Sequence, residues 1–199
     1  MLLRVLTAAA ALALASPGEA PAAETAPSVQ APQAAAPKTK AAQLDELFAT
    51  LKAAPNDEAA SAAERSTNRL WLQSGSDTVD LLMNWALKAM SEKDYSLALD
   101  YLDRVTIMKP DYAEGWNTRA TVHFLAQDYS ASIKDINRTL ALEPRHYGAM
   151  SGLGMILKEL GEDKRAIAAF REALKIDPYL DSVKKALADL EARQKGEET

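Results

Sequence analysis

The segment around residues 114–124 contains the side chains that are best suited to form a binding or metal site. Trp116, Arg119 and His123 recur at helical spacing, which would place an indole, a guanidinium and an imidazole on one face. A metal at His123 would need further ligands, and the only other histidine, His146, belongs to another predicted helix. A metal site at His123 is therefore not expected, and the alternative is that Trp116 and His123 are packing positions. Arg119 is expected to pack its stem and extend its guanidinium to the surface.

Other candidate catalytic residues lack the partner residues or companion motifs that catalysis would require. Asp100 and Asp103 could act as paired carboxylates, but Arg104 lies one turn from Asp100, and we expect a solvated face. Ser182-x-x-Lys185 matches a nucleophilic serine pattern without its companion motifs. The sequence has no glycine-rich phosphate loop and no HExxH. It predicts no enzyme, no cofactor and no metal site.

The amino-acid composition argues against several classes of partner and site. The 199 residues carry a net charge of −5, and no dense Lys/Arg stripe is present to neutralise phosphates, so a nucleic-acid partner is not expected. Cysteine is absent, which removes disulfides and thiolate metal sites. Alanine, leucine, lysine, glutamate and aspartate dominate, as they do in helical proteins.

The amino terminus predicts export. Arg4 precedes an apolar run over residues 5–15, and Ala13-Leu14-Ala15 supplies a small-x-small cleavage signal. The run is shorter than the roughly 20 residues that a spanning helix needs. We predict a signal peptide over 1–15, cleaved after Ala15 or alternatively after Ala20. The mature protein would then be periplasmic or secreted, with no membrane anchor; a signal anchor or a disordered apolar start is the alternative.

Residues 16–41 are rich in proline and alanine and have no hydrophobic period, so they predict a disordered tether. Residues 42–76 predict a degenerate N-terminal helix pair that ends at Gly75.

A 34-residue period organises the rest of the chain. Pro110, Pro144 and Pro178 are each 34 residues apart, and three units align without a gap over 79–112, 113–146 and 147–180. Each unit predicts two antiparallel helices. The first helices are expected at about 78–91, 112–125 and 146–159, and the second at about 95–108, 129–142 and 163–176.

Small residues at the eighth position of each unit let the two helices approach closely, and large residues fill the space between pairs. The small residues are Ala86, Ala120 and Gly154. Since one pair cannot bury its own apolar face, neighbouring pairs stack. Residues 180–194 predict an amphipathic capping helix for the last unit.

These motifs resemble the tetratricopeptide repeat (TPR) family. The second unit carries the signature as Trp116-x2-Arg119-Ala120-x2-His123, and the third unit as Leu153-Gly154-x2-Leu157 followed by Ala166-x3-Phe170-x2-Ala173-x4-Pro178. The resemblance implies an all-α, right-handed α-solenoid, whose first helices line a concave groove for a protein or peptide. It implies no catalysis. The layout also looks like that of small exported TPR proteins of Gram-negative bacteria.

Within that groove, the resemblance points to seven partner-binding residues. They are Met83, Leu87, Asn117, Thr121, Ser151, Met155 and Lys158. An asparagine amide is suited to hold a peptide backbone, and methionines offer adaptable apolar contacts. The alternative is that Met83, Leu87 and Met155 pack against adjacent helices, and both interpretations stay open at this point.

TPR co-chaperones hold acidic carboxyl-terminal tails with cations and asparagines on successive first helices. Here only Asn117 has that chemistry and the cations are missing, so a carboxylate clamp is not expected. A separate hypothesis is self-association through the 43–74 helix pair or the convex surface, with the groove unused.

Overall fold

The computed structural model describes residues 38–197, and over this range the protein is helical without strands. The all-α prediction is confirmed. The predicted signal peptide (1–15) and all but the last residues of the predicted tether lie outside the described residues. None of the described helices has the length and apolar character needed to cross a membrane.

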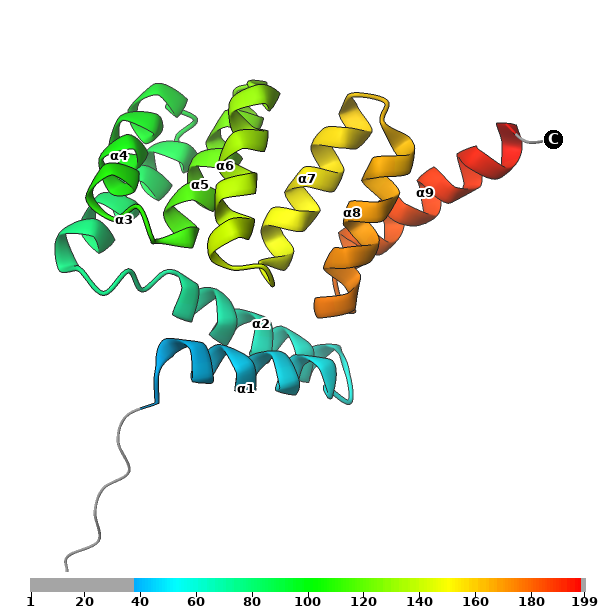
Figure 1. The fold of residues 1–199 in the computed structure, drawn as a ribbon, viewed down its shortest axis with the longest axis horizontal. Coiled ribbons are helices and arrows are strands. Elements are labelled where there is room, and N and C mark those ends of the chain that lie inside the picture. Colours follow the sequence, from blue (N-terminus) through cyan, green and yellow to red (C-terminus); the bar gives the residue numbers. More distant parts are fainter. Residues whose placement is uncertain (1–37, 198–199) are drawn as a thin grey trace, which may run out of the picture. The chain divides into compact units, whose positions relative to one another are not determined.

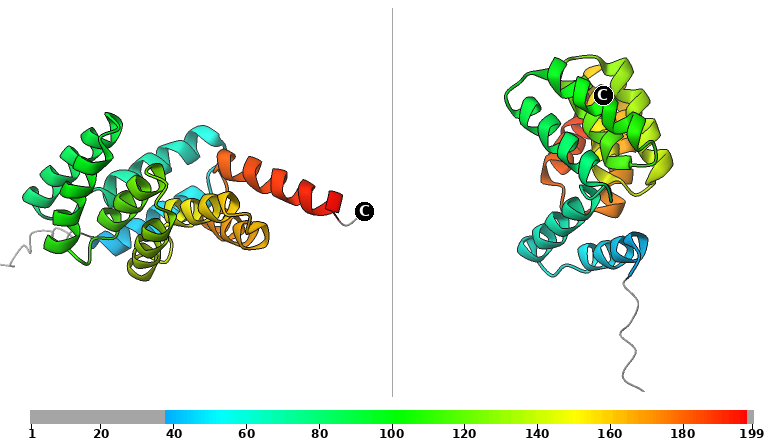
Figure 2. Two further views of the ribbon diagram at one scale, coloured as in Figure 1. Left: turned by 90° about the horizontal axis from the view of Figure 1, so that it is seen from above. Right: turned by 90° about the vertical axis from the view of Figure 1, so that its left-hand side faces the viewer.

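Three helix pairs form the body of the array (Figure 1). They are α3 (Asp77–Ser91) with α4 (Tyr95–Met108), α5 (Ala113–Leu125) with α6 (Tyr129–Leu142), and α7 (Tyr147–Glu159) with α8 (Asp163–Ile176). Each lies within one residue of the range that the 34-residue period predicts. The first helices also touch one another, because α5 contacts both α3 and α7. They form one layer and the second helices form the other (Figure 2).

Small residues set how closely the two helices of each pair approach. Ala86 and Ala120 are buried. At Gly154 an added Cβ would lie 2.4 Å from the Phe170 ring, so α7 and α8 can meet only because the side chain is missing. The phenylalanine is itself fully buried. Close packing of this kind fixes the geometry of the pair.

The turn inside each pair also repeats. Lys93, Gln127 and Gly161 are 34 residues apart, and all three have left-handed backbones, with φ of 62°, 62° and 75°. Asp94 and Asp128 follow the first two and accept a backbone hydrogen bond that caps the next helix. The same local geometry therefore reverses the chain three times.

Helix α9 (Asp181–Glu197) closes the carboxyl-terminal end. Val183, Ala186 and Leu190 are buried against the α8 core around Phe170. Its apolar side thus covers the last pair, as the amphipathic pattern predicts.

The amino-terminal helices α1 (Lys40–Lys52) and α2 (Asp57–Trp71) form a hairpin that does not continue the stack. It lies across the inter-repeat loops instead (Figure 1). Helix α1 begins two residues before the predicted start of the helix pair at 42, because the Thr39 side chain accepts from the Ala42 N–H and caps it.

Three tyrosines, one after each repeat proline, join the hairpin to the array. The Tyr112 hydroxyl donates to the Leu72 carbonyl at 2.9 Å, and the Tyr147 hydroxyl donates to Asn68 Oδ1 at 3.3 Å. The Tyr179 hydroxyl donates to the Ala54 carbonyl at 2.6 Å. One hairpin therefore ties together the loops of all three units.

Candidate functional site

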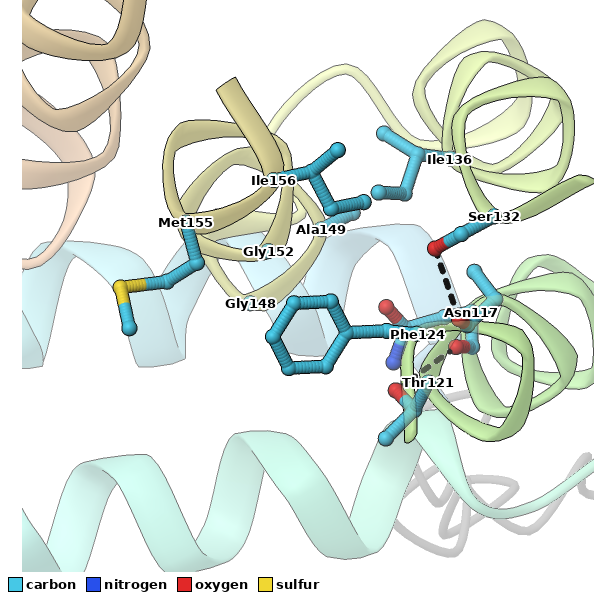
Figure 3. Close-up of a pocket in the computed structure, with 11 residues that line it drawn as sticks. Asn117, Thr121, Phe124, Ser132, Ile136, Gly148, Ala149, Gly152, Met155 and Ile156 are labelled. Carbon is cyan, nitrogen blue, oxygen red and sulfur yellow. Dashed lines mark hydrogen bonds between the residues drawn. The ribbon is translucent and has the colours of Figure 1, made fainter. Parts of the chain in front are cut away.

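A pocket of about 120 Å³ opens between α5 and α7 (Figure 3). Most of its lining is apolar, and the few polar groups come from short side chains. The lining residues are Asn117, Ala120, Thr121, Phe124, Ser132, Ile136, Gly148, Ala149, Gly152, Met155 and Ile156. The Ser132 hydroxyl donates to the Ala120 carbonyl at 2.7 Å, so it is satisfied within the protein. An apolar group is the ligand that such a lining suits.

Two glycines on α7 create the space. Gly148 and Gly152 are four residues apart and line the pocket without side chains. A Cβ added at Gly152 would lie 3.7 Å from Ile136, at ordinary contact distance. In the preceding unit the equivalent positions hold Glu114 and Thr118, which are hydrogen-bonded to each other at 3.2 Å. The pocket therefore exists at one inter-repeat junction because this junction lacks those side chains.

Helix α5 supplies the polar edge of the pocket. The Asn117 amide nitrogen donates to Glu114 Oε1 at 3.0 Å, and no other residue in 38–197 hydrogen-bonds to its side-chain oxygen. The Thr121 hydroxyl donates to the Asn117 backbone carbonyl at 3.0 Å. A peptide N–H approaching this edge would find the Asn117 oxygen as its acceptor.

Aromatic and thioether groups flank the pocket mouth. Figure 3 shows the Phe124 ring pointing across the pocket towards α7, where Gly148, Gly152 and Met155 lie. Met155 is 36 % exposed, so part of its side chain is accessible from solvent. A flexible thioether and an aromatic ring can both adapt to an inserted apolar side chain.

The structure brings three of the seven predicted groove residues together. Asn117, Thr121 and Met155 line one pocket. Ser151 and Lys158 lie on the same helix as Met155 but outside the lining, and the Ser151 hydroxyl donates back to the Tyr147 carbonyl at 2.7 Å.

The other two belong to the first pair. Met83 is 2 % exposed inside the α3–α4 core, so the prediction that it lines the groove is wrong: the side chain packs between the helices of its own pair and its neighbour. Leu87 is partly buried against the same core. For these two residues the packing alternative describes the structure better.

Arg119 does not behave as its sequence position suggests. Its guanidinium donates from Nε and Nη2 to both oxygens of Asp135 at 2.7 and 2.8 Å, and from Nη1 to Asp103 and Thr106 at 2.8 and 3.0 Å. The prediction of a surface guanidinium is wrong, because Asp135 offers a buried bidentate partner. These hydrogen bonds hold the pKa of Arg119 above its ordinary value.

A signal for this network was present in the sequence. The positions equivalent to Arg119 hold Trp85 and Leu153, and those equivalent to Asp135 hold an apolar or aromatic residue in both other units. Opposite charges at two otherwise apolar positions of one unit indicate a pair.

Trp116 and His123 pack around this network. The Arg119 guanidinium lies 4.7 Å from the Trp116 ring centroid, and the indole N–H donates to the Pro110 carbonyl at 3.1 Å. The two His123 nitrogens lie 3.9 Å from carboxylate oxygens of Asp128 and Asp135, beyond hydrogen-bond reach. Residues 38–197 contain no cluster of three side chains that could hold a metal.

The chain is similar to proteins built from tetratricopeptide repeats. The family profile described as "Tetratricopeptide repeat" matches residues 117–181. A TPR repeat-containing protein of Rhizobium etli is 44 % identical over 136 residues, which cover 68 % of this chain and 67 % of that protein.

More distant similarities extend to eukaryotic proteins. The small glutamine-rich tetratricopeptide repeat-containing protein 2 of Saccharomyces cerevisiae is 28 % identical over 90 residues, covering 45 % of this chain but 26 % of that protein. The fold is also similar to the first TPR domain of Spaghetti (RPAP3) bound to the HSP90 peptide SRMEEVD. That comparison has a TM-score of 0.58 and 18 % identity, and it covers 60 % of this chain and 94 % of the other.

Proposed function

Because the chain belongs to the tetratricopeptide repeat family, whose members are typically non-catalytic scaffolds, we propose that it holds a protein or peptide segment in the pocket between α5 and α7. The observation that carries this proposal is the apolar pocket opened by Gly148 and Gly152. The ligand would insert one apolar side chain there. Its neighbouring backbone N–H would donate to the side-chain oxygen of Asn117, to which no side chain or backbone group of residues 38–197 donates.

The chemistry of the lining argues for an apolar anchor rather than an acidic tail. The Spaghetti domain is bound to the HSP90 peptide SRMEEVD, which has two glutamates and ends in an aspartate. The pocket lining here contains no lysine or arginine, so a carboxylate would be desolvated without a cation to pair with. A leucine, methionine or phenylalanine would instead gain about 1.5–3 kcal/mol from burial.

We further propose that the protein acts in the periplasm. The support is the amino-terminal sequence, in which Arg4 precedes an apolar run that ends in a small-x-small motif. The family resemblance to exported bacterial TPR proteins agrees with this location. Fractionation of cells that produce the full chain tests it directly, since a protein that stays in the cytoplasmic fraction at full length would contradict export.

Site-specific photo-crosslinking tests the groove itself. A photoreactive residue at the exposed Thr121 position would be activated in the native host's extract, in the wild type and in a Gly152→Leu variant whose new side chain fills the pocket. Ala188→Leu, on the exposed side of α9, is the matched control. We expect the crosslinked product to disappear in Gly152→Leu and persist in Ala188→Leu. An unchanged product in both variants would contradict groove binding.

A further inference from the structure

The first helix pair exposes large apolar side chains at the amino-terminal end of the array. Leu81 and Trp85 of α3 are 48 % and 46 % exposed, and Leu97 of α4 is 38 % exposed. The Tyr101 ring lies 5.6 Å from the Trp85 ring, and a pocket of about 210 Å³ opens beside both of them. Trp85, Ala89, Leu97 and Tyr101 form its apolar walls. An apolar patch of this kind marks an interaction surface.

The repeat geometry identifies this patch as a stacking face. The residue 34 positions after Leu81 is Gly115, where an added Cβ would lie 2.7 Å from Val105 of the preceding pair. The residue 68 positions after Leu81 is Ala149, which is 1 % exposed. In the second and third units, this face is therefore buried against the unit before it. In the first unit it is open, because the α1–α2 hairpin lies over the inter-repeat loops instead (Figure 1).

The opposite end of the array cannot serve as its partner. Helix α9 turns its apolar side inward, and its exposed positions include Lys185, Asp189 and Arg193. A polar outer face is what a solenoid needs at a capped end. Head-to-tail stacking of copies would press the apolar face of one end against the charged face of the other.

We propose that the α3–α4 face of one copy packs against the same face of a second copy, forming a two-fold dimer. Four exposed residues of α3 and its carboxyl-terminal cap follow a heptad stripe, as antiparallel helix pairs require. The stripe consists of Thr78, Leu81, Trp85, Lys88 and Glu92. Its midpoint is Trp85, so this residue lies on the two-fold axis and the two tryptophans meet there.

Charge and shape both fit a second copy in this arrangement. With Trp85 on the axis, Leu81 of each copy reaches the partner's pocket beside Ala89, four residues to the other side of the axis. Asp77 begins α3 and Lys93 follows its carboxyl-terminal cap, eight residues before and after Trp85, so this arrangement brings Asp77 of each copy towards Lys93 of the other. The same patch thus supplies both the knob and the hole.

The size of the face limits the contact area of the dimer. Helix α3 has 15 residues and is about 22 Å long, and the face is two helices wide. Such a contact falls at the small end of specific interfaces, a size class that includes weak and transient complexes, so we expect association to depend on concentration in the micromolar range.

Sedimentation equilibrium of the full chain from about 1 to about 200 μM tests the proposal. The variant Leu81→Glu carries a charge into the face, and Leu160→Glu, at a 49 % exposed leucine after α7, is the matched control. We expect the wild type and Leu160→Glu to dimerise alike, and Leu81→Glu to weaken association at least tenfold. A monomeric wild type over this range, or equal association of the two variants, would overturn the proposal.

The absence of cysteine from the sequence allows the antiparallel arrangement to be tested separately. Thr78 and Glu92 are each seven residues from Trp85 and both are exposed, so they face each other across the axis. Oxidation of the Thr78→Cys/Glu92→Cys double variant should give a covalent dimer, and neither single variant should do so. Adding Leu81→Glu should abolish the crosslink, and its persistence would contradict the proposed face.

Discussion

The indole of Trp71 and the imidazole of His146 lie face to face, with ring centroids 4.0 Å apart and planes 9° apart. The imidazole is buried, and its Nδ1 accepts the Ala149 N–H at 3.1 Å, which caps α7. Because Nδ1 accepts, the neutral ring carries its proton on Nε2 and donates it to Glu114 Oε2 at 2.9 Å. One side chain therefore joins the amino-terminal hairpin to two successive repeats.

We expect His146→Ala to lower the free energy of unfolding by about 3 kcal/mol, because it removes a helix cap, a ring stack and a buried hydrogen bond. His146→Asn keeps a side-chain acceptor for the Ala149 N–H and should recover about 1 kcal/mol of the loss. Urea denaturation of both variants measures the difference. Equal destabilisation by the two substitutions would show that the cap contributes nothing.

The Arg119–Asp135 pair should show strong coupling. Asp135 is 4 % exposed, so Arg119→Leu leaves a buried carboxylate without its bidentate partner and should cost about 3–5 kcal/mol. In the double variant Arg119→Leu/Asp135→Leu neither charge is left alone, and we expect most of that loss to be recovered. A double-mutant cycle by urea denaturation provides the measurement. Additive effects would contradict the coupling.

Two glycines on the same helix should respond in opposite directions to alanine. Both substitutions gain about 1 kcal/mol of helix propensity. At Gly154 the new Cβ would lie 2.4 Å from Phe170, so overpacking should produce a net loss of about 1–3 kcal/mol. At Gly152 the nearest atom is 3.7 Å away, and the net gain should be about 0.5–1 kcal/mol. Thermal denaturation compares them, and a loss at Gly152 would mean that the pocket is not open.

The stability of the hairpin contact should depend on pH. Asp177, after α8, is fully buried near Glu64 of α2, and burial raises the pKa of both carboxyl groups above their ordinary values of 3.8 and 4.5. As pH rises past those values, the unfolded chain releases its protons before the folded chain does. The folded state is therefore penalised as pH increases through the raised pKa values, and the penalty is absent in acid.

Asp177→Asn removes this penalty and keeps the side-chain oxygen that accepts the Tyr179 N–H at 2.9 Å. We expect the Tm to rise by about 2–4 °C at pH near 7.5, and the gain to vanish at pH near 3.5. Calorimetry at the two pH values makes the comparison, with Glu64→Gln as the partner control. A gain of the same size in acid would mean that the effect is not ionisation.

The repeat period made most of the array predictable. Positions such as Ala86, Ala120 and Gly154 recur because each pair solves the same packing problem, so helix positions follow from spacing alone. The family resemblance pointed to Asn117 and Met155 as groove residues, and both line the pocket. Met83 was not, because spacing gives a face of a helix and not how deeply the neighbouring pair covers it.

The placement of the amino-terminal hairpin could not be predicted from the sequence. Its contacts join residues far apart in the sequence, as in the ion pair of Asp45 with Arg145 at 2.5 Å, 100 positions apart, and the hydrogen bond from Tyr179 to Ala54, 125 positions apart. The hairpin lacks the 34-residue register, so nothing local indicates which surface it covers. The α3–α4 face is exposed because of that placement, so its exposure could not be predicted from the sequence either.

The central claim is that the space over Gly152 receives an apolar side chain of a peptide. Parallel selection of a random peptide library on the wild type and on Gly152→Leu tests it most directly. We expect the wild type to enrich peptides with a single leucine, methionine or phenylalanine anchor, and to bind them at least about tenfold more tightly than the variant does. Recovery of the same peptides by both proteins, or enrichment of acidic carboxyl-terminal tails, would contradict the claim.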